Sequence, residues 1–428
     1  MIAVHGCMQS RKVIFVNRFF YPDHSATSQL LSDLAFSLTE KDYLVSVITS
    51  GQLYDRPAAR LVRDEVIQGV RVFRVRSARF GRHGLLGRML DYLTFYLSAA
   101  LCLYRLARHG DVVVAKTDPP LISAIAAPIA VLRRAHLINW VQDLFPEVAM
   151  ELGIKGISRV TPFLLSMRNK SLKRAKQNVV LGKRMAERLI GSDVPPDRIV
   201  TIHNWADGDL ILPIAPQSNG LRTAWNLGGK FVVGYSGNMG RAHDFEAILE
   251  AIERLCSRPD IVFVFIGGGE QRVVVERFAR ERNLPNVVFQ AYQPREQLAY
   301  SLSVPDVHLI SLLPRLEGLI VPSKFYGICA AGRATLYVGD PEGEIPQIIR
   351  TVGCGNTVEP GNAAGLADVI EKWSKNPKIV RAMGQRARAE FERSFDKRYA
   401  IQTWSGILDS LISGEFDHGT ATSGSIPF

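Results

Sequence analysis

The sequence predicts an α/β protein made of two doubly wound units in tandem, each with a parallel sheet. A chain of 428 residues is long enough for two or three domains at about 150 residues each. Its strand-like runs are apolar without interruption, and turns and amphipathic helices separate them, as in sheets covered on both faces. A composition of 47% hydrophobic and 22% charged residues is that of a globular chain with a sizeable core.

The first series of strands begins at Lys12. KVIFVNRFF (12–20) is an apolar run, YPDHSATS interrupts it, and QLLSDLAFSLTEKD then carries leucines at helical spacing. LVSVITS (44–50) completes a strand–helix–strand unit. Later strands of this series are expected at VRVFRV, DVVVAK, HLINWVQD and QNVVLG.

The second series begins at Lys230 and repeats the same rhythm. FVVGYSG is a strand followed by a turn and the helix FEAILEAIERLC, and IVFVFIG is a strand followed by a turn and the helix VVVERFARER. Further strands are expected at VVFQAY, DVHLISL and ATLYVG, and HNWADGDLILPIAP joins the two series. The sequence also predicts a long helix from Arg388 to Ile412, broken at Ser394.

These elements define the expected domain boundaries. The small, polar residues at the C-terminus predict a flexible tail, and the last part of the long helix is expected to cross back to the first domain. We assign an N-terminal extension to residues 1–11, the first domain to 12–210, the second to 211–395, the returning helix to 396–414 and the tail to 415–428.

The excess positive charge lies entirely in the first half of the chain. Residues 1–216 contain 29 Lys and Arg against 18 Asp and Glu, and the remaining residues contain 23 of each. This asymmetry predicts a polyanionic partner for the first half, either nucleic acid or an anionic membrane. Nucleic acid is disfavoured, because the basic segments alternate with aliphatic runs and not with aromatic stacking platforms.

Three segments of the first half favour the membrane. Residues 85–108 have 13 uncharged positions between Asp91 and Arg105, fewer than the roughly 20 that span a bilayer. Residues 119–132 are also too short, and residues 158–176 combine six Lys and Arg with apolar side chains. Basic and apolar residues together indicate an interfacial surface. The alternatives are buried helices for the first two segments and a solvated face for the third.

The cysteines, the histidines and the N-terminal residues indicate which cellular compartment and which cofactors to expect. The five cysteines are scattered without a CxxC pair, which favours a reducing compartment. The nine histidines form no HxxxH or HExxH pair, and the one D-x-D, Asp207 and Asp209, falls in a loop-like stretch. No apolar core typical of a signal peptide precedes Lys12. We therefore expect a cytoplasmic protein without a metal.

Two glycine-rich turns of the second half predict an anionic nucleotide ligand. GYSGNMGRAHD follows a strand and opens a helix, where glycines let the backbone approach a phosphate and Arg241 adds a cation. IGGGEQR is a second such turn. Neither matches GxGxxG, and a tight turn without a ligand is the alternative. RLEGLIVPSKFYGICAAGR adds Glu317 and Lys324, charges that normally face water or a ligand.

Acidic residues follow two strands of the first half. Asp118 lies in TDPP, and Asp143 and Glu147 lie in INWVQDLFPEVA. An acid at the carboxyl end of a strand can receive a proton from an acceptor hydroxyl, although helix capping explains each of them equally well. His24, in YPDHSATS after the first strand, has a comparable place, and a structural loop histidine is its alternative.

The assembly resembles the retaining glycosyltransferases of family 4, in particular the bacterial branch of colanic acid and O-antigen sugar transferases. The resemblance runs from about Lys12 to Ile412 and rests on RFFYPDHSATSQLLSDLA, QDLFPE, HNWADGD, GYSGNMG, FIGGGEQR and VPSKFYGICAAGR followed by GEIPQII. It implies GT-B architecture, with two Rossmann-like domains facing across a cleft. It also implies sugar transfer with retention and without metal, from a nucleotide-diphosphate sugar in the second domain to a polyprenyl-diphosphate-linked saccharide. The enzyme would lie on the inner face of the cytoplasmic membrane.

The resemblance also implies roles for named residues. Glu317 would hydrogen-bond the donor sugar, Lys324 would neutralise the departing diphosphate, and Asp143 or Asp118 would act on the acceptor proton. His24 and Glu147 would contact the acceptor. The expected nucleotide-sugar contacts are Gly237, Asn238, Gly240, Arg241, Gly268, Gly269, Arg272, Pro322, Ser323, Lys324 and Glu344.

The sequence departs from the family pattern at several positions. Glu317 stands two positions early, and Gly327 occupies the place of a second Glu that normally contacts the ribose. Asn238 and His243 stand where the family has an Arg and a Lys. Arg241, Lys324 or Glu344 would have to substitute. The donor stays open between GDP-fucose and a UDP-N-acetyl sugar, and a GT-B-like epimerase without a membrane acceptor is the alternative function.

Overall fold

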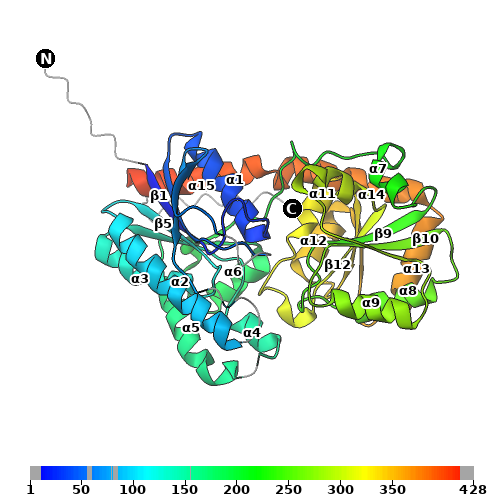
Figure 1. Ribbon diagram of the computed structural model, residues 1–428, viewed down its shortest axis with the longest axis horizontal. Coiled ribbons are helices and arrows are strands. Elements are labelled where there is room, and N and C mark those ends of the chain that lie inside the picture. Colours follow the sequence, from blue (N-terminus) through cyan, green and yellow to red (C-terminus); the bar gives the residue numbers. More distant parts are fainter. Residues whose placement is uncertain (1–10, 55–59, 79, 81–84, 155, 415–428) are drawn as a thin grey trace, which may run out of the picture. The chain divides into compact units, whose positions relative to one another are not determined.

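The chain folds into two α/β units (Figure 1). The computed structural model describes residues 11–414 except 55–59, 79, 81–84 and 155. Unit 1 comprises the residues up to His203 together with those from Ala400 onward, and unit 2 comprises Asn204–Tyr399. Each unit has its own sheet, and each is described by itself below.

The sheet of unit 1 has the strand order β3-β4-β2-β1-β5-β6-β7-β8. All neighbouring pairs are parallel except β3 and β4, which are antiparallel. The strands are β1 (Lys12–Val16), β2 (Leu44–Ser50), β3 (Asp64–Ile67), β4 (Val70–Val75), β5 (Val112–Lys116), β6 (His136–Trp140), β7 (Gln177–Val180) and β8 (Ile199–Thr201). Every residue of β5 is buried, as expected for a central strand covered on both faces.

Helices cover both faces of this sheet. They are α1 (Ala26–Thr39), α2 (Leu85–Leu106), α3 (Ile122–Arg133), α4 (Glu147–Glu151), α5 (Ile157–Arg174) and α6 (Lys183–Ile190). Phe95, Ala99 and Leu103 of α2 pack with α3 against β1, β2 and β5 in one apolar core. Figure 1 shows α2, α3 and α5 on one side of the sheet and α1 on the other. In the part of the chain that the structure describes, no helix combines the length and apolar character needed to cross a membrane.

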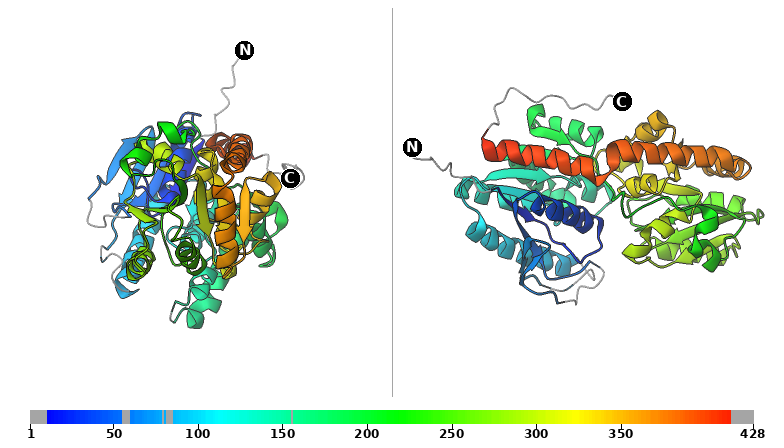
Figure 2. Two further views of the ribbon diagram at one scale, coloured as in Figure 1. Left: turned by 90° about the vertical axis from the view of Figure 1, so that its right-hand side faces the viewer. Right: turned by 90° about the horizontal axis from the view of Figure 1, so that it is seen from above.

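The C-terminal helix completes unit 1. α15 (Lys397–Ser413) starts in unit 2 and continues into unit 1 at Ala400, where Figure 2 shows it lying along the unit. The Trp404 ring lies 4.9 Å from the Trp140 ring, centroid to centroid. The Tyr43 hydroxyl donates to Asp409 over 2.6 Å. The end of the chain is therefore part of the core of the unit that its beginning forms.

The sheet of unit 2 is entirely parallel, with the order β11-β10-β9-β12-β13-β14. The strands are β9 (Phe231–Ser236), β10 (Ile261–Ile266), β11 (Val287–Gln290), β12 (Val307–Ser311), β13 (Ala334–Val338) and β14 (Gly355–Val358). From β9 the chain adds β10 and β11 on one side of that strand, and it then crosses to its other side to form β12. Such a reversal of strand order places a ligand site at the carboxyl ends of the strands beside it.

Helices on both faces bury this sheet. They are α7 (Gly220–Ala224), α8 (Glu246–Arg254), α9 (Arg272–Glu281), α10 (Leu298–Ser303), α11 (Lys324–Ala330), α12 (Glu344–Val352), α13 (Ala363–Ser374) and α14 (Pro377–Glu390). The residues Phe391–Phe395 form a π-helical turn after α14, and Asp396 is extended, where the sequence predicted a break.

Candidate active site

The two glycine-rich turns of unit 2 lock together at the carboxyl ends of β9 and β10. The backbone N–H of Met239 donates to the Gly268 carbonyl over 2.7 Å, and the N–H of Gln271 donates to the Met239 carbonyl over 2.9 Å. A methyl group on Gly269 would lie 2.6 Å from both Asn238 Oδ1 and the Met239 carbonyl. Only glycine fits at 269, so the two turns form one rigid edge.

Lys324, the first residue of α11, lies beside this edge. Its Nζ donates to the Tyr235 hydroxyl over 2.5 Å and lies 3.8 Å from the centroid of the tyrosine ring. A methyl group on Gly237 would lie 3.9 Å from Lys324 Cε. Among the described residues no carboxylate pairs with this ammonium, and burial lowers the pKa of Lys324 to about 7. The site therefore holds a cation that an anionic ligand would stabilise.

His243 cannot supply a second positive charge here. Its Nδ1 lies 2.6 Å from the Ser311 carbonyl, so Nδ1 carries the hydrogen and Nε2 is left as an acceptor. Burial and the Lys324 charge lower the pKa of His243 to about 3. The imidazole is neutral at physiological pH, and Lys324 carries the charge alone at this point.

The side chain of Glu317 accepts hydrogen bonds from other residues of unit 2. The Tyr337 hydroxyl donates to Oε1 over 2.7 Å, and the backbone N–H of Glu344 donates to Oε2 over 3.3 Å. The carboxylate thus lies at the N-terminus of α12, and the side chain of Glu317 is buried. Burial raises the pKa of Glu317. The charge in the middle of an apolar run has an internal partner.

The other nucleotide-sugar candidates differ in exposure and in the hydrogen bonds that their side chains make. Arg272 donates to the carbonyls of Gly267 and Gln290 and to Glu276, so it braces the second turn. Asn238 and Arg241 are exposed in the first turn, with Gly240 between them. A buried proline and a half-buried serine, Pro322 and Ser323, lead into α11.

In unit 1, backbone bonds hold the carboxyl ends of β1, β5 and β6 together. The N–H of Arg18 donates to the Asp118 carbonyl over 2.6 Å, and that of Thr117 donates to the Trp140 carbonyl over 3.2 Å. The Thr117 hydroxyl accepts from the N–H of Asp143 over 3.4 Å and from that of Gln142 over 2.8 Å. Two of the predicted acids, Asp118 and Asp143, therefore lie at adjacent strand ends.

The two acids have similar pKa values for the same main reason. Desolvation by the surrounding protein raises the pKa of Asp118 to about 6, which Arg18 and a hydrogen bond from Thr27 partly oppose. Desolvation, and then the charge of Asp118, raise the pKa of Asp143 to about 6. The Asp143 side chain still reaches solvent. Groups with pKa values this close to neutrality are suited to proton transfer.

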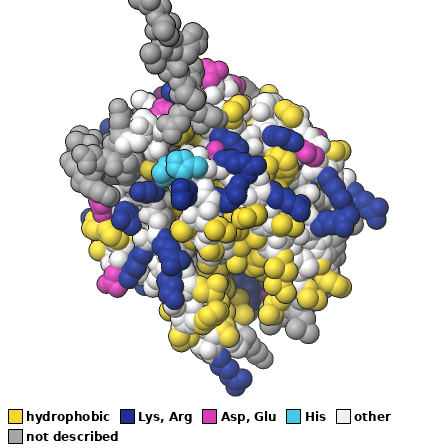
Figure 3. Space-filling view, turned by 90° about the vertical axis from the view of Figure 1, so that its left-hand side faces the viewer, with side chains coloured by type: hydrophobic (Ala, Val, Ile, Leu, Met, Phe, Trp, Pro, Cys, Tyr) yellow, Lys and Arg dark blue, Asp and Glu magenta, His cyan; other side chains and the backbone are white. Residues whose placement is uncertain are grey.

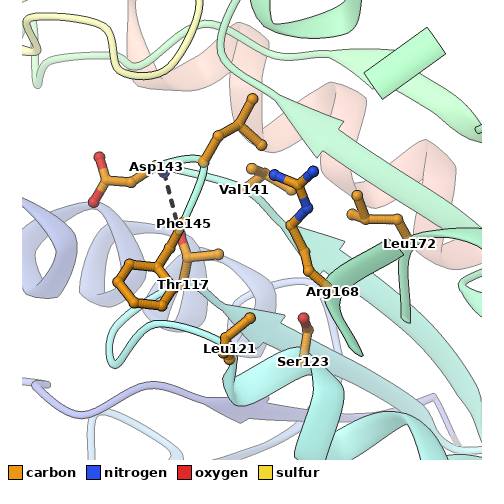
Figure 4. Close-up of a pocket in the computed structure, with 9 residues that line it drawn as sticks. Thr117, Leu121, Ser123, Val141, Asp143, Phe145, Arg168 and Leu172 are labelled. Carbon is orange, nitrogen blue, oxygen red and sulfur yellow. Dashed lines mark hydrogen bonds between the residues drawn. The ribbon is translucent and has the colours of Figure 1, made fainter. Parts of the chain in front are cut away.

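Glu147 and His24, the two predicted acceptor contacts, have different surroundings. Glu147 starts α4, and Arg168 Nη1 contacts both of its carboxylate oxygens at 2.6 and 2.7 Å. Arg168 and Asp143 both line a small pocket of unit 1, and Figure 4 shows the Asp143 carboxylate turned to the side opposite the Arg168 guanidinium. His24 is exposed in the loop before α1. The structure therefore places Asp118 and Asp143 at adjacent strand ends, Glu147 in an ion pair with Arg168, and His24 in an exposed loop.

Asp207 of the D-x-D pair has a structural role. It accepts from Lys397 Nζ over 2.8 Å and from the N–H groups of Asp209 and Leu210. Within the residues that the structure describes, no group of three or more His, Cys, Asp or Glu side chains is placed to hold a metal ion.

Sequence reasoning missed two residues of these sites. Tyr235 lies in β9, just before the first glycine turn, and its only sequence signal is an aromatic residue between two glycines. Lys116 ends β5 beside Asp118 and is fully buried. A lysine at the end of a strand ordinarily indicates exposure, so the sequence carried no signal for it.

Two doubly wound units, the second with a lysine beside interlocked glycine turns, define the GT-B class of glycosyltransferases. Residues 27–205 match the family described as Glycosyl transferase 4-like domain, and residues 221–390 match the family described as Glycosyl transferases group 1. The chain belongs to the family 4 type of these enzymes, and the predicted fold class and enzyme class are confirmed.

Two curated bacterial relatives match across much of their length. The chain is 27% identical to the probable glycosyltransferase WbjE of Pseudomonas aeruginosa over 78% of this chain and 83% of that protein. It is 25% identical to the putative colanic acid biosynthesis glycosyl transferase WcaI of Escherichia coli over 64% and 68%.

Solved structures share the fold at low identity. Sucrose-phosphate synthase from Thermosynechococcus elongatus has a TM-score of 0.76 at 15% identity, over 94% of this chain and 99% of that one. Anabaena HepE in complex with UDP-glucose has a TM-score of 0.68 at 15% identity, over 93% and 99%. WaaG, a glycosyltransferase involved in lipopolysaccharide biosynthesis, has a TM-score of 0.68 at 14% identity, over 92% and 99%.

Proposed function

We propose that this glycosyltransferase moves a sugar from a nucleoside-diphosphate sugar, bound by unit 2, to a lipid-diphosphate-linked saccharide, bound by unit 1, in the biosynthesis of a bacterial surface polysaccharide. The observation that carries the donor half is the ammonium of Lys324 beside two interlocked glycine turns, with no carboxylate paired to it among the described residues. The complexes of HepE with UDP and UDP-glucose support a nucleotide-sugar donor. The names of WcaI and WaaG support the polysaccharide role.

Lys324 would act on the leaving group. When the bond from the sugar C1 to the diphosphate oxygen breaks, negative charge develops on that oxygen. A cation already in place stabilises this charge without reorganising, and one such contact typically contributes about 2.7–4 kcal/mol to lowering the barrier. The acceptor hydroxyl bonds to C1 and releases its proton to Asp143 or Asp118.

Lys324→Ala tests the donor site. We expect turnover to fall by roughly 100- to 1,000-fold, while the circular dichroism spectrum and the melting temperature change little. Lys372→Ala is the matched control, because Lys372 is an exposed lysine of α13 in the same unit. Full turnover in purified Lys324→Ala protein would exclude Lys324 from the site.

Thermal-shift measurements with GDP, UDP and their sugars would identify the donor. A ligand at 100 times its dissociation constant adds about 2.7 kcal/mol of stability. We propose retention and metal independence from the family resemblance alone. The anomeric coupling constant of the product by NMR tests the first, and activity in EDTA tests the second. Conversion of the free donor into its epimer would indicate an epimerase instead.

The acceptor half of the proposal rests on an exposed apolar stripe of α2. Leu90, Leu93, Leu97, Leu101 and Tyr104 recur at intervals of three and four, and their exposed fractions are 46%, 53%, 65%, 51% and 44%. This spacing places all five on one helical face. The opposite face, with Phe95 and Leu103, is buried in the core. The apolar stripe of α2 therefore faces outward, and each of its five side chains is substantially exposed to solvent.

Neighbouring helices widen this surface and surround it with positive charge. Val131 and Leu132, at the end of α3, and Phe163 of α5 are 64%, 69% and 67% exposed. Figure 3 shows apolar side chains gathered on this face with Lys and Arg side chains around them. The basic residues of these segments include Arg105, Arg108, Arg133, Arg134, Arg159, Lys170, Lys173, Arg174 and Lys176. An apolar surface with a basic rim matches an anionic lipid bilayer, so we propose peripheral binding to the cytoplasmic face of the inner membrane.

Vesicle sedimentation tests this surface. The double variant Leu97→Asp, Leu101→Asp should lose binding to phosphatidylglycerol vesicles, and the unchanged protein should bind neutral phosphatidylcholine vesicles far more weakly. Val273→Asp is the control, since Val273 is equally exposed at 68% but lies on α9 of unit 2. Undiminished binding of the double variant would rule out the apolar stripe of α2 as the membrane contact.

A further inference from the structure

Lys116 is a fully buried lysine whose amine has no hydrogen-bond partner among the described residues. It ends β5 with 0% of its surface exposed, and in the part of the chain that the structure describes its Nζ meets no hydrogen-bond acceptor. The Nζ lies 3.3 Å from the centroid of the Trp140 ring, which is opposite it in the β5–β6 register. Burying an ammonium without a partner costs several kcal/mol. If the side chain at position 116 only had to fill space in the core, methionine or leucine would do so without this cost.

The carboxylates around Lys116 come from three elements. Desolvation lowers the pKa of Lys116 well below its ordinary value, and three carboxylates oppose this. Asp118 lies just after β5, Asp143 lies just after β6, and Asp33 lies on α1. Arg18, from the loop after β1, and Asp23, from the loop before α1, act in turn on Asp118. The amine of Lys116 therefore interacts electrostatically with both acids at these adjacent strand ends, and Arg18 acts on Asp118 as well.

These groups are held near one another by the backbone and not by direct contact. Thr117, between Lys116 and Asp118, donates its N–H to the Trp140 carbonyl and accepts from the Asp143 N–H with its hydroxyl. The α15 residue Trp404 packs against Trp140 and closes the far side. A charge fixed at short range in a dry site acts on its neighbours without touching them.

We infer that Lys116 is a positioning residue of the acceptor site, whose ammonium keeps Asp118 and Asp143 available as carboxylates. The inference rests on the proposed function. Two carboxylates close to one another raise each other's proton affinity, and a nearby cation offsets this. During transfer the acceptor O–H bond breaks, its oxygen bonds to C1, the diphosphate leaves with the electron pair of the C1–O bond, and the proton passes to one of the two carboxylates. Lys116 touches none of the reacting atoms.

Lys116→Met tests the inference by removing the charge and keeping the side-chain length. We expect the pKa values of Asp118 and Asp143 to rise by roughly one unit in carboxyl-carbon NMR titrations of protein labelled at Asp, assigned with Asp118→Asn and Asp143→Asn. The acidic limb of the transfer rate should move to higher pH by the same amount, with the KM for the donor unchanged. Val113→Ala is the control, because it opens a cavity at a fully buried position of the same strand without removing a charge. It should leave both pKa values unchanged. Unchanged pKa values in folded Lys116→Met would overturn the inference.

A second measurement uses the unsubstituted protein and does not depend on the fold of any variant. Lysine ε-carbon NMR spectra should show Lys116 as an ammonium at pH 7, and a neutral amine there would overturn the inference. If no sugar is transferred to any acceptor, the proposed function fails, whereas both NMR titrations still decide the role of Lys116.

Discussion

Tyr337→Phe tests whether Glu317 is held inside unit 2 as an ionised carboxylate. The substitution removes the 2.7 Å hydrogen bond from the Tyr337 hydroxyl and leaves the 3.3 Å bond from the Glu344 N–H. A hydrogen bond to a charged group contributes about 1.5–3 kcal/mol, and one between neutral groups about 0.5–1.5 kcal/mol. The loss should therefore depend on the ionisation of Glu317.

The sign of the pH dependence follows from burial. The pKa of Glu317 is raised above its ordinary value of 4.5, so the folded state binds the proton more tightly than the unfolded chain. Stability from this carboxyl is complete below pH 4.5 and is lost as the pH rises through the folded pKa. Removing the tyrosine hydroxyl raises that pKa further. Tyr337→Phe should lower the free energy of unfolding by about 1.5–3 kcal/mol at pH 8 and by about 0.5–1.5 kcal/mol near pH 4.5.

Urea unfolding at both pH values, followed by tryptophan fluorescence, measures the difference. Tyr300→Phe is the control, because Tyr300 is 43% exposed in the same unit, and its effect should stay within about 0.5 kcal/mol. An equal loss at both pH values would refute the ionised state of Glu317. A loss below about 0.5 kcal/mol at pH 8 would show that the carboxylate is not held by Tyr337 and is free to turn toward a sugar.

Three other substitutions test the two sites. Gly269→Ala should separate the glycine turns, because its methyl group would meet Asn238 at 2.6 Å, and should weaken nucleotide binding in calorimetry by more than tenfold; unchanged affinity would show that the turns need not interlock. In the unsubstituted protein, stability from Asp118 is present below pH 3.8 and is lost as the pH rises through about 6, so melting temperatures of Asp118→Asn should lack this decline, and a decline that persists would contradict the assignment. Arg168→Met should cost about 3 kcal/mol in urea unfolding by leaving Glu147 unpaired, and adding Glu147→Gln should recover part of the loss, whereas no recovery would mean that the ion pair is not the cause.

The fold could be predicted from the sequence wherever a strand is buried on both faces. The runs that became β1, β2, β9 and β10 are mainly apolar, and that pattern allows few other structures. The strand β3 was missed because it is an antiparallel edge strand in which exposed and half-buried residues alternate. Its sequence, DEVI, is short and half charged, so pairing with β4 and not intrinsic preference makes it a strand.

The candidate site was less predictable, because its chemistry depends on contacts between distant residues. The sequence showed that Glu317 and Lys324 needed partners. It could not show that Tyr337 of β13 and Tyr235 of β9 provide them. Glu147 looked like an acceptor contact, and its pairing with Arg168 arises only when α4 and α5 meet. The substrate roles given to individual residues stay predictions.

The route of the chain through the two units has a consequence for biosynthesis. Unit 1 is made first but needs Trp404 and Asp409, near the end of the chain, to cover Trp140 and to accept from Tyr43. Unit 2 lies entirely between these parts. On the ribosome, unit 2 can therefore finish folding while unit 1 still lacks its last helix. The first half emerges with its apolar stripe exposed and its core open, so it is the part of the nascent chain that needs protection longest. A premature stop before residue 400 would remove the last helix of unit 1 and so damage the domain at the other end of the sequence.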